Sequence, residues 1–228
     1  MDRFDDAYWF ALDEETLVRN ATLVRTADAE IAGGGLPVLT DIRRPDERPS
    51  TQITVVTRDR RGLFADLTGA LASTGGGIMD AKVFTAPDGL ALDVFWVSGL
   101  DPHQDAARLT GRLEAVVRES RSFKPAGPPP MMGRRLKAFT VPPEVNVDND
   151  ASAVFTVIEV AGRDRPGLLH DLSAALRDLK LSIGSAHVAT YGERAVDVFY
   201  VKGPAGLKIT GETQIARIEQ RLEEVLAG

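Results

Sequence analysis

The pattern of apolar and polar positions predicts the same series of elements twice along the chain. Two runs rich in β-branched and aromatic residues, "QITVVT" (52–57) and "VFTVIEVA" (154–161), are typical of strands. After each run, apolar residues recur three to four positions apart, which predicts a helix with one buried face. These faces consist of Leu63, Phe64, Leu67, Ala70 and Leu71 in the first series, and of Leu168, Leu169, Leu172, Ala175 and Leu176 in the second.

A strand pair and a closing helix complete each series. The pairs are predicted at 78–85 with 90–97, joined through Pro87-Asp88-Gly89, and at 182–190 with 194–201. The first closing helix is expected to begin at Asp101-Pro102. The apolar residues that line the two closing helices are Leu109, Leu113 and Val116, and then Ile215, Ile218, Leu222 and Val225.

The two series are also related by sequence. "RDRRGLFADL" (58–67) and "RDRPGLLHDL" (163–172) agree at seven of ten positions and lie 105 residues apart. "LDVFWVSG" (92–99) and "VDVFYVKG" (196–203) repeat at an offset of 104, so one residue is missing from the second hairpin loop. A period of this size is that of a domain, so we expect two copies of one fold.

Strand–helix–strand–strand–helix is a ferredoxin-like unit that lacks one strand. No strand can follow the last helix within the sequence, but an extended candidate precedes each copy: "LPVLTDI" (36–42) and "KAFTVPPEVNV" (137–147). Pro142 and Pro143 suit an edge strand better than a central one. The fold class is therefore expected to be α+β, with two ferredoxin-like domains in tandem. Our hypothesis is that each copy is circularly permuted, with its edge strand first.

The predicted organisation has four parts. A helix is expected from about Thr16 to Ala29 with Asp13 as its cap. The aromatic run Tyr8 to Phe10 before it needs a surface to pack on, so we expect the chain to be cut from a longer one. The predicted parts are a helical connecting segment at 1–32, domain 1 at 33–122, a Pro/Gly-rich linker at 123–135 and domain 2 at 136–228.

Composition excludes several classes of function. The chain has 27 basic and 33 acidic residues and a net charge of −6, which argues against nucleic acid as a partner. It has no cysteine, so disulfides, thiolate nucleophiles and Cys-based zinc sites are excluded. No apolar run approaches the roughly 18 residues of a membrane span. We therefore expect no membrane association and a cytoplasmic location.

The repeated turn is the main candidate for chemistry. Asp59 and Asp164 stand where a strand turns into a helix, and each can be read simply as an N-cap. Pro166, in the expected first turn, supports that reading. Gly62 and Gly167 are harder to explain structurally, because glycine costs helix stability. Their missing side chains would admit a small anionic group, such as a carboxylate, to the positive helix end.

These stretches, with "GIMDAKV" and "SIGSAHV" downstream, resemble the ACT domain, a ferredoxin-like module that commonly binds amino acids at domain interfaces. The tandem resembles the C-terminal regulatory region of the bacterial PII uridylyltransferase/uridylyl-removing enzymes. "YWFALDEETLVRNATLVRTADAE" (8–30) is similar to the segment that joins their hydrolase domain to the ACT pair. The resemblance implies an enzyme that adds UMP to PII when glutamine is low and removes it when glutamine is high. Glutamine, PII and the missing nucleotidyltransferase and HD domains are the implied partners.

The resemblance also implies a ligand site in each repeated turn. Backbone N–H groups would hold the ligand carboxylate, with a strand residue such as Ile78 or Ile183 closing over it. Arg61 replaces the proline found at Pro166, so unequal binding is expected, with the second copy favoured. The remaining candidate site residues are Asp59, Arg60, Gly62 and Leu63 in the first copy, and Asp164, Arg165, Gly167 and Leu168 in the second.

Catalysis by this segment is not expected. His170-Asp171 matches the dipeptide of HD hydrolases, but only three histidines occur, and a helix-surface histidine is the better reading. Asp148-Asn149-Asp150 resembles paired magnesium ligands but lacks the glycine-rich stretch upstream, so we expect a polar turn. Neither Gly33–Gly35 nor Gly75–Gly77 continues as a P-loop.

No cofactor is expected for this segment, while magnesium is implied for the missing catalytic domains. Two alternatives stay open. The pair can be a docking or dimerisation module without a ligand, or a free-standing ACT-repeat regulator.

Overall fold

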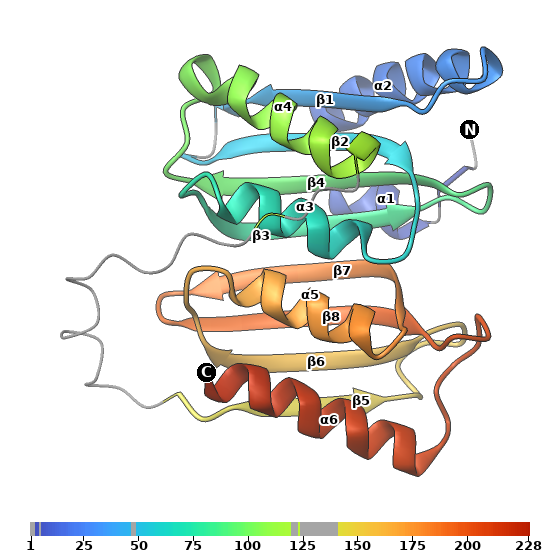
Figure 1. The fold of residues 1–228 in the computed structure, drawn as a ribbon, viewed down its shortest axis with the longest axis vertical. Helices are drawn as coiled ribbons and strands as arrows, with labels where there is room; N and C mark the ends of the chain where they lie inside the picture. The colour runs from blue at the N-terminus through green and yellow to red at the C-terminus, as the bar shows by residue number, and fades with distance from the viewer. Residues whose placement is uncertain (1–2, 5, 47–48, 120–122, 124–140) are drawn as a thin grey trace.

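The computed structural model describes all residues except 1–2, 5, 47–48, 120–122 and 124–140, and a single antiparallel sheet of eight strands organises the described chain (Figure 1). Its strand order is β1-β2-β4-β3-β7-β8-β6-β5. The elements of the first copy are β1 (Val38–Arg43), β2 (Thr51–Arg58), α3 (Leu63–Ala72), β3 (Gly77–Thr85), β4 (Leu90–Ser98) and α4 (Pro102–Glu119). Those of the second are β5 (Glu144–Asp148), β6 (Thr156–Arg163), α5 (Leu168–Asp178), β7 (Ser182–Tyr191), β8 (Arg194–Lys202) and α6 (Glu212–Ala227).

Each copy has the permuted ferredoxin-like topology expected from the sequence. β1 pairs antiparallel with β2, from Val38 opposite Thr57 to Arg43 opposite Gln52, and so occupies the edge position. In the second copy β5 pairs with β6 in the same way. The strand begins only after Pro142 and Pro143, because proline cannot donate a ladder hydrogen bond. The α+β fold class and the leading edge strands are therefore confirmed, while the first residues of the predicted second segment, 137–140, lie outside the described residues.

The two copies join through both layers of the fold. β3 pairs antiparallel with β7, where Asp80, Ala81 and Lys82 face Ala189, Val188 and His187. On the helical face α3 packs against α5, and one hydrophobic core runs through both copies. The predicted linker lies, apart from Phe123, outside the described residues, so the proposed domain boundaries stay predictions.

Helices cover the two faces of the sheet unequally. α3, α4, α5 and α6 lie on one face, and the N-terminal helices α1 (Asp6–Ala11) and α2 (Glu14–Ala32) lie on the other, behind the first copy (Figure 1). Tyr8 of α1 is buried, and its ring meets that of Phe84 edge to face at 5.0 Å between centroids. The aromatic run thus packs on the sheet in part, while Phe10 stays 88% exposed.

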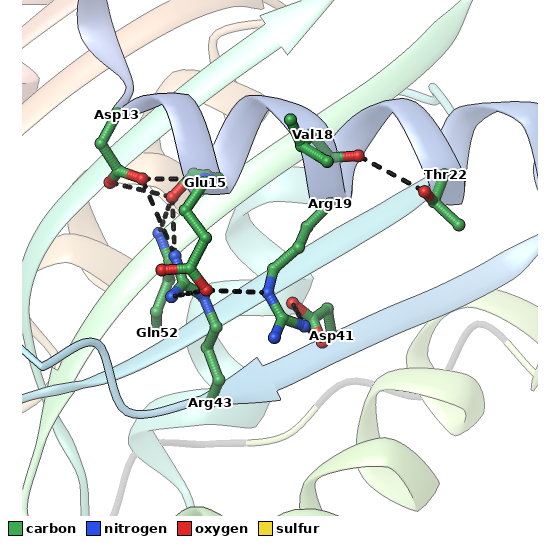
Figure 2. Close-up of polar contacts among 9 residues, drawn as sticks. Asp13, Glu15, Val18, Arg19, Thr22, Asp41, Arg43 and Gln52 are labelled. Carbon is green, nitrogen blue, oxygen red and sulfur yellow. Dashed lines mark hydrogen bonds and ion pairs between the residues drawn. The ribbon is translucent and has the colours of Figure 1, made fainter.

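A polar network fixes α2 onto β1 and β2 (Figure 2). Asp13 caps the helix as expected, because its Oδ1 accepts the Thr16 N–H at 2.8 Å. The Thr16 hydroxyl oxygen in turn accepts hydrogen bonds from Arg43 at 2.9 Å and from Gln52 at 3.1 Å. Arg43 also forms an ion pair with Glu15 at 2.8 Å. The N-terminal segment is therefore attached to the first copy in a defined register.

Candidate functional site: a cavity between the two copies

The repeated turns end in glycine N-caps. Gly62 and Gly167 are the N-cap residues of α3 and α5, with φ of 80° and 83°, and neither helix has a side-chain cap. Positive φ is the region where glycine is favoured, so the backbone itself requires these glycines. The interpretation of Asp59 and Asp164 as N-caps is wrong, because each lies three residues before the cap. Pro166 likewise precedes the helix and is not in its first turn.

The two aspartates instead fold back on their own loops. Each carboxylate accepts a backbone N–H from the next residue, Arg60 for Asp59 and Arg165 for Asp164. Burial raises the pKa of both carboxyl groups, although that N–H and the neighbouring guanidinium oppose the shift. Each loop therefore holds an acid with a raised pKa three residues before the helix cap.

A cavity opens in front of the first loop and is built from both copies. Residues 59–65 form one wall, and residues 181–183 with Ser173 and Arg177 of the second copy form the opposite one. The floor is the sheet, through Val83, Thr85, Ala91 and Asp93. The space is about 40 Å³, several times the ~10–15 Å³ that one water molecule needs. The site thus lies at the junction of the two domains.

Arg177 provides a second reason why the first loop needs a glycine at position 62. A Cβ atom added at Gly62 would lie 2.5 Å from Cδ of Arg177, so a side chain there would collide with the arginine of the other copy. The guanidinium lies near Asp66, with 3.6 Å between Nη1 and Oδ1, and Arg60 contacts the other oxygen of Asp66 at 2.8 Å. Arg60 and Arg177, which both line the cavity, thus share the carboxylate of Asp66.

The copies differ at this point. The residue of the first copy that corresponds to Arg177 is Ala72, so the second loop lacks an equivalent arginine from its neighbour. In the second copy Arg165 pairs with Asp171 at 2.6 Å. This difference supports the expectation of unequal sites, but the preference for the second copy stays a prediction.

The structure brings one part of the predicted site together. Asp59, Arg60, Gly62 and Leu63 share the cavity with Ile183, which reaches it from the other copy. The predicted closing strand is therefore supplied across the junction. The other predicted site residues, Asp164, Arg165, Gly167 and Leu168, form the corresponding loop of the second copy, and Ile78 lies on β3 at the position that corresponds to Ile183.

Two buried carboxyl groups were missed by the sequence reasoning. Asp93 on β4 and Asp197 on β8 are each 2% exposed, and Oδ1 of each has no hydrogen-bond partner among the described residues. Burial and the charge of Asp59 raise the pKa of Asp93 well above its usual range. Burial and Asp164 raise the pKa of Asp197 to about 7. The sequence did contain a signal for these two residues, because an acid stands inside each of the two repeated apolar strands, in "LDVF" and "VDVF".

The two sequence motifs set aside as non-catalytic have structural roles. Nδ1 of His170 lies 2.8 Å from the Ala65 carbonyl oxygen, which can only accept, so Nδ1 carries the proton. His170 thus bridges α5 and α3 and is partly buried there, whereas the sequence suggested a free helix surface. The expected polar turn at 148–150 is present: Asp148 accepts the Asp150 N–H at 2.6 Å, and Asn149 donates to Ile209 at 2.8 Å.

Neither a metal site nor a membrane span is found in the described part of the chain. No group of three or more His, Asp or Glu residues there is arranged to hold a metal ion. None of its helices combines the length and apolar character needed to cross a bilayer.

Comparison with known proteins agrees with this architecture. The model of the "ACR family N-terminal ACT domain" matches residues 151–228. The second copy is therefore an ACT domain, and the first copy repeats its sequence and topology.

The particular relatives are bifunctional uridylyltransferase/uridylyl-removing enzymes. The chain is 44% identical to that of Azospirillum brasilense and 42% identical to that of Gluconobacter oxydans (strain 621H), in each case over 97% of its length. It is 40% identical to the enzyme of Rhodospirillum rubrum over 96%. The chain spans about a quarter, 24%, of the length of these relatives. It is thus homologous along nearly its whole length to an ACT-containing region of this enzyme family.

Proposed function

We propose that this chain is the regulatory region of an enzyme that uridylylates and deuridylylates PII, and that it senses glutamine. Its homology to bifunctional uridylyltransferase/uridylyl-removing enzymes supports the first part. The observation that carries the second part is the cavity between the copies, where Arg177 of one copy faces the Gly62 loop of the other. Such an enzyme would work in the cytoplasm, with its nucleotidyltransferase and HD domains in the same polypeptide.

The cavity offers the chemistry that an amino-acid carboxylate requires. The first N–H groups of a helix have no intrahelical partners, and α3 has no side-chain cap of its own. The Leu63 N–H already donates to the Arg60 carbonyl oxygen at 3.0 Å, so the next N–H groups of the first turn are the ones offered to a ligand. These donors and the positive end of the helix favour a carboxylate. The Arg177 guanidinium adds a charge-assisted donor from the other copy. We therefore place the α-carboxylate of glutamine between Gly62 and Arg177, in the first copy rather than the second copy favoured by sequence.

Binding at this place would report on how the two copies are arranged. Free glutamine is larger than the few water molecules that about 40 Å³ accommodates, so Arg177 has to move away from Gly62 when the ligand enters. Arg177 lies on α5, which packs on α3 of the other copy. A ligand can regulate only if it binds two states with different affinity, and a shift between α3 and α5 supplies such states.

Isothermal titration of glutamine into the chain tests the proposal, with glutamate and asparagine as comparison ligands. We expect saturable binding of glutamine, weakened about tenfold or more by Arg177→Ala, because a charge-assisted hydrogen bond to the ligand is lost. Arg217→Ala is the matched control, since Arg217 is exposed on α6, away from the cavity lining. A folded chain that gives no heat at millimolar glutamine would contradict glutamine sensing.

A docking role is the second candidate, and the exposed residues of the N-terminal helices favour it. Phe10 is 88% exposed and Trp9 is 38% exposed, on the face of the sheet opposite the cavity. Aromatic residues are enriched at protein interfaces. If this role is the correct one, Phe10→Ser will weaken association with the catalytic domains or with PII, measured by analytical ultracentrifugation, while glutamine has no effect.

A further inference from the structure

Asp93 stands at a position where an ordinary core would have an apolar residue. It lies on the central strand β4, between Ala91 and Phe95 on the same face, and both neighbours belong to the core under the helices. Its side chain is 2% exposed, and Oδ1 has no hydrogen-bond partner among the described residues. An unsatisfied buried carboxyl oxygen is costly, so such a group needs an explanation beyond packing.

The orphaned carboxyl group lies at the proposed ligand cavity. Asp93 is the acidic member of a floor that is otherwise formed by Val83, Thr85 and Ala91. The cationic residues of the lining belong to the two walls, Arg60 and Arg61 to one and Arg177 to the other. A ligand whose carboxylate is held between these walls would therefore direct its other end toward the floor, where a polar partner is missing.

The second copy provides a comparison, because it has an acid at the corresponding position that does not line the cavity. Asp197 corresponds to Asp93 in the repeat and is equally buried. Its carboxyl group accepts a hydrogen bond from the backbone N–H of Ala189. Oδ1 lacks a partner in both acids, but among the described residues only Asp197 has such a backbone donor, and only Asp93 lines the cavity. The chain thus provides its own matched control.

We propose that Asp93 determines the ligand specificity of the cavity, by pairing its carboxyl group with a primary carboxamide at the end of the ligand side chain. This inference rests on the proposed amino-acid binding and goes beyond it by assigning the group that recognises the side chain. A carboxylic acid and a carboxamide are complementary: the acid O–H donates to the amide oxygen, and an amide N–H donates to the acid carbonyl.

The environment of Asp93 favours the form that this pairing needs. Burial, and secondly the charge of Asp59, raise the pKa of Asp93 well above its usual range, which favours the protonated carboxyl group that can donate its O–H. A ligand carboxylate in place of the carboxamide would bring a negative charge into the same buried floor without a compensating cation. The cavity therefore accepts glutamine and rejects glutamate.

The test is calorimetric titration of glutamine and glutamate into the wild-type chain and three variants. Asp93→Leu removes both hydrogen-bonding groups and keeps the branched arrangement of non-hydrogen atoms, and we expect glutamine affinity to fall at least about tenfold. Asp93→Asn can still pair with a carboxamide and should stay within a few-fold of wild type. Asp197→Leu, the matched control, should also stay within a few-fold. Circular dichroism and thermal unfolding establish that each variant is folded.

The outcomes separate this inference from the proposed function. If wild type binds glutamine and Asp93→Leu binds it equally well, with the same preference over glutamate, the role of Asp93 is overturned and glutamine sensing stands. If Asp197→Leu loses as much affinity as Asp93→Leu, the effect is structural and the inference is again overturned. If wild type does not bind glutamine, both proposals fail.

Discussion

At the scale of single residues, Gly62 carries two constraints that can be measured separately. Its φ of 80° is unfavourable for any residue with a Cβ, and its missing side chain leaves room for Arg177. Gly111, in the middle of α4, has neither constraint, because nothing lies within 4 Å of an added Cβ. The two glycines therefore form a matched pair.

We expect Gly62→Ala to destabilise the chain by about 2 kcal/mol, since left-handed backbone costs an alanine about 1–2 kcal/mol and contact with Arg177 adds to this. Gly111→Ala should stabilise it by about 0.5–1 kcal/mol. Urea unfolding measures both effects. A double-mutant cycle with Arg177→Ala separates the two contributions. In that background Gly62→Ala should lose only the stability that the left-handed backbone costs, because the contact with Arg177 is gone. Equal unfolding free energies for the two alanine variants would contradict this account.

The buried acid Asp197 predicts an unusual dependence of stability on pH. Its pKa is about 7 in the folded chain, against 3.8 ordinarily, because burial disfavours the charged form. Between these values the folded state binds one more proton than the unfolded state, so the unfolding free energy falls as pH rises. The contribution is fully present below about pH 4 and is lost above about pH 7, and it amounts to about 4 kcal/mol.

Asp197→Asn should remove this slope, because asparagine keeps an oxygen for the Ala189 N–H but does not ionise. Thermal or urea unfolding of wild type and variant at several pH values between 4 and 8 gives the difference, in which contributions from other groups cancel. The variant should gain stability relative to wild type as pH rises. A difference that does not change with pH would refute the shift.

The roles of individual residues were the part of the site that was hardest to predict from the sequence. The repeat identified the turn, and its glycines and aspartates line or flank the cavity in the first copy. Arg177 could not be identified, because its role depends on the pairing of α5 with α3 across the junction. Gly62 has a positive φ and is itself the N-cap, so helix α3 begins after it. The prediction that Asp59 caps this helix was therefore wrong.

At the scale of elements, the close approach of α3 and α5 depends on Gly69. A Cβ atom there would lie 2.6 Å from the Phe123 carbonyl oxygen and 2.8 Å from Nδ1 of His170. Helix propensity alone would favour alanine at this interior position by about 1 kcal/mol. The observed packing predicts the opposite effect, namely that alanine at this position destabilises the chain.

Gly69→Ala is therefore expected to destabilise the chain by about 1–3 kcal/mol, as overpacking of a tight interface does. Gly111→Ala again provides the control for helix propensity. Urea unfolding measures both, and loss of the His170 contact can be followed through the imidazole proton resonances. If Gly69→Ala stabilises as much as the control, the helices do not pack as described.

The attachment of α2 gives a second prediction at this scale. Asp13→Ala removes the cap that accepts the Thr16 N–H, and should cost about 1 kcal/mol. Thr22→Ala, nine residues further along the chain on the same helix (Figure 2), removes only a weak 3.4 Å contact to the Val18 carbonyl oxygen at an exposed site. That control should be neutral or slightly stabilising. Equal losses for both variants in thermal unfolding would contradict the capping role.

Elements were predicted well where the spacing of apolar residues agreed with the capping and turn residues at the element ends. α2 was expected from Thr16, and its first turn at Glu14 follows from the Asp13 cap that the sequence already indicated. The permuted edge strands followed from counting the strands that a ferredoxin-like unit needs. The pairing of β3 with β7 had no local signal, because edge-to-edge pairing depends on how the whole copies meet.

At the scale of the whole molecule, the continuous sheet makes the two copies one structural unit. The core passes through both copies, and the cavity takes its walls from each. A ligand in this position touches both domains at once, so its binding depends on their relative arrangement. The N-terminal helices pack on the first copy alone, on the face of the sheet opposite α3 and α5.

The most direct test of the central claim is to map glutamine binding on the backbone amides of the isotope-labelled chain by NMR. The account predicts saturable shifts in two separate stretches, 59–65 of the first copy and 173–183 of the second, because both line the cavity. Arg177→Ala should weaken both sets of shifts together. Saturable shifts confined to the second loop, 164–168, or to neither copy, would contradict a glutamine site built from both domains.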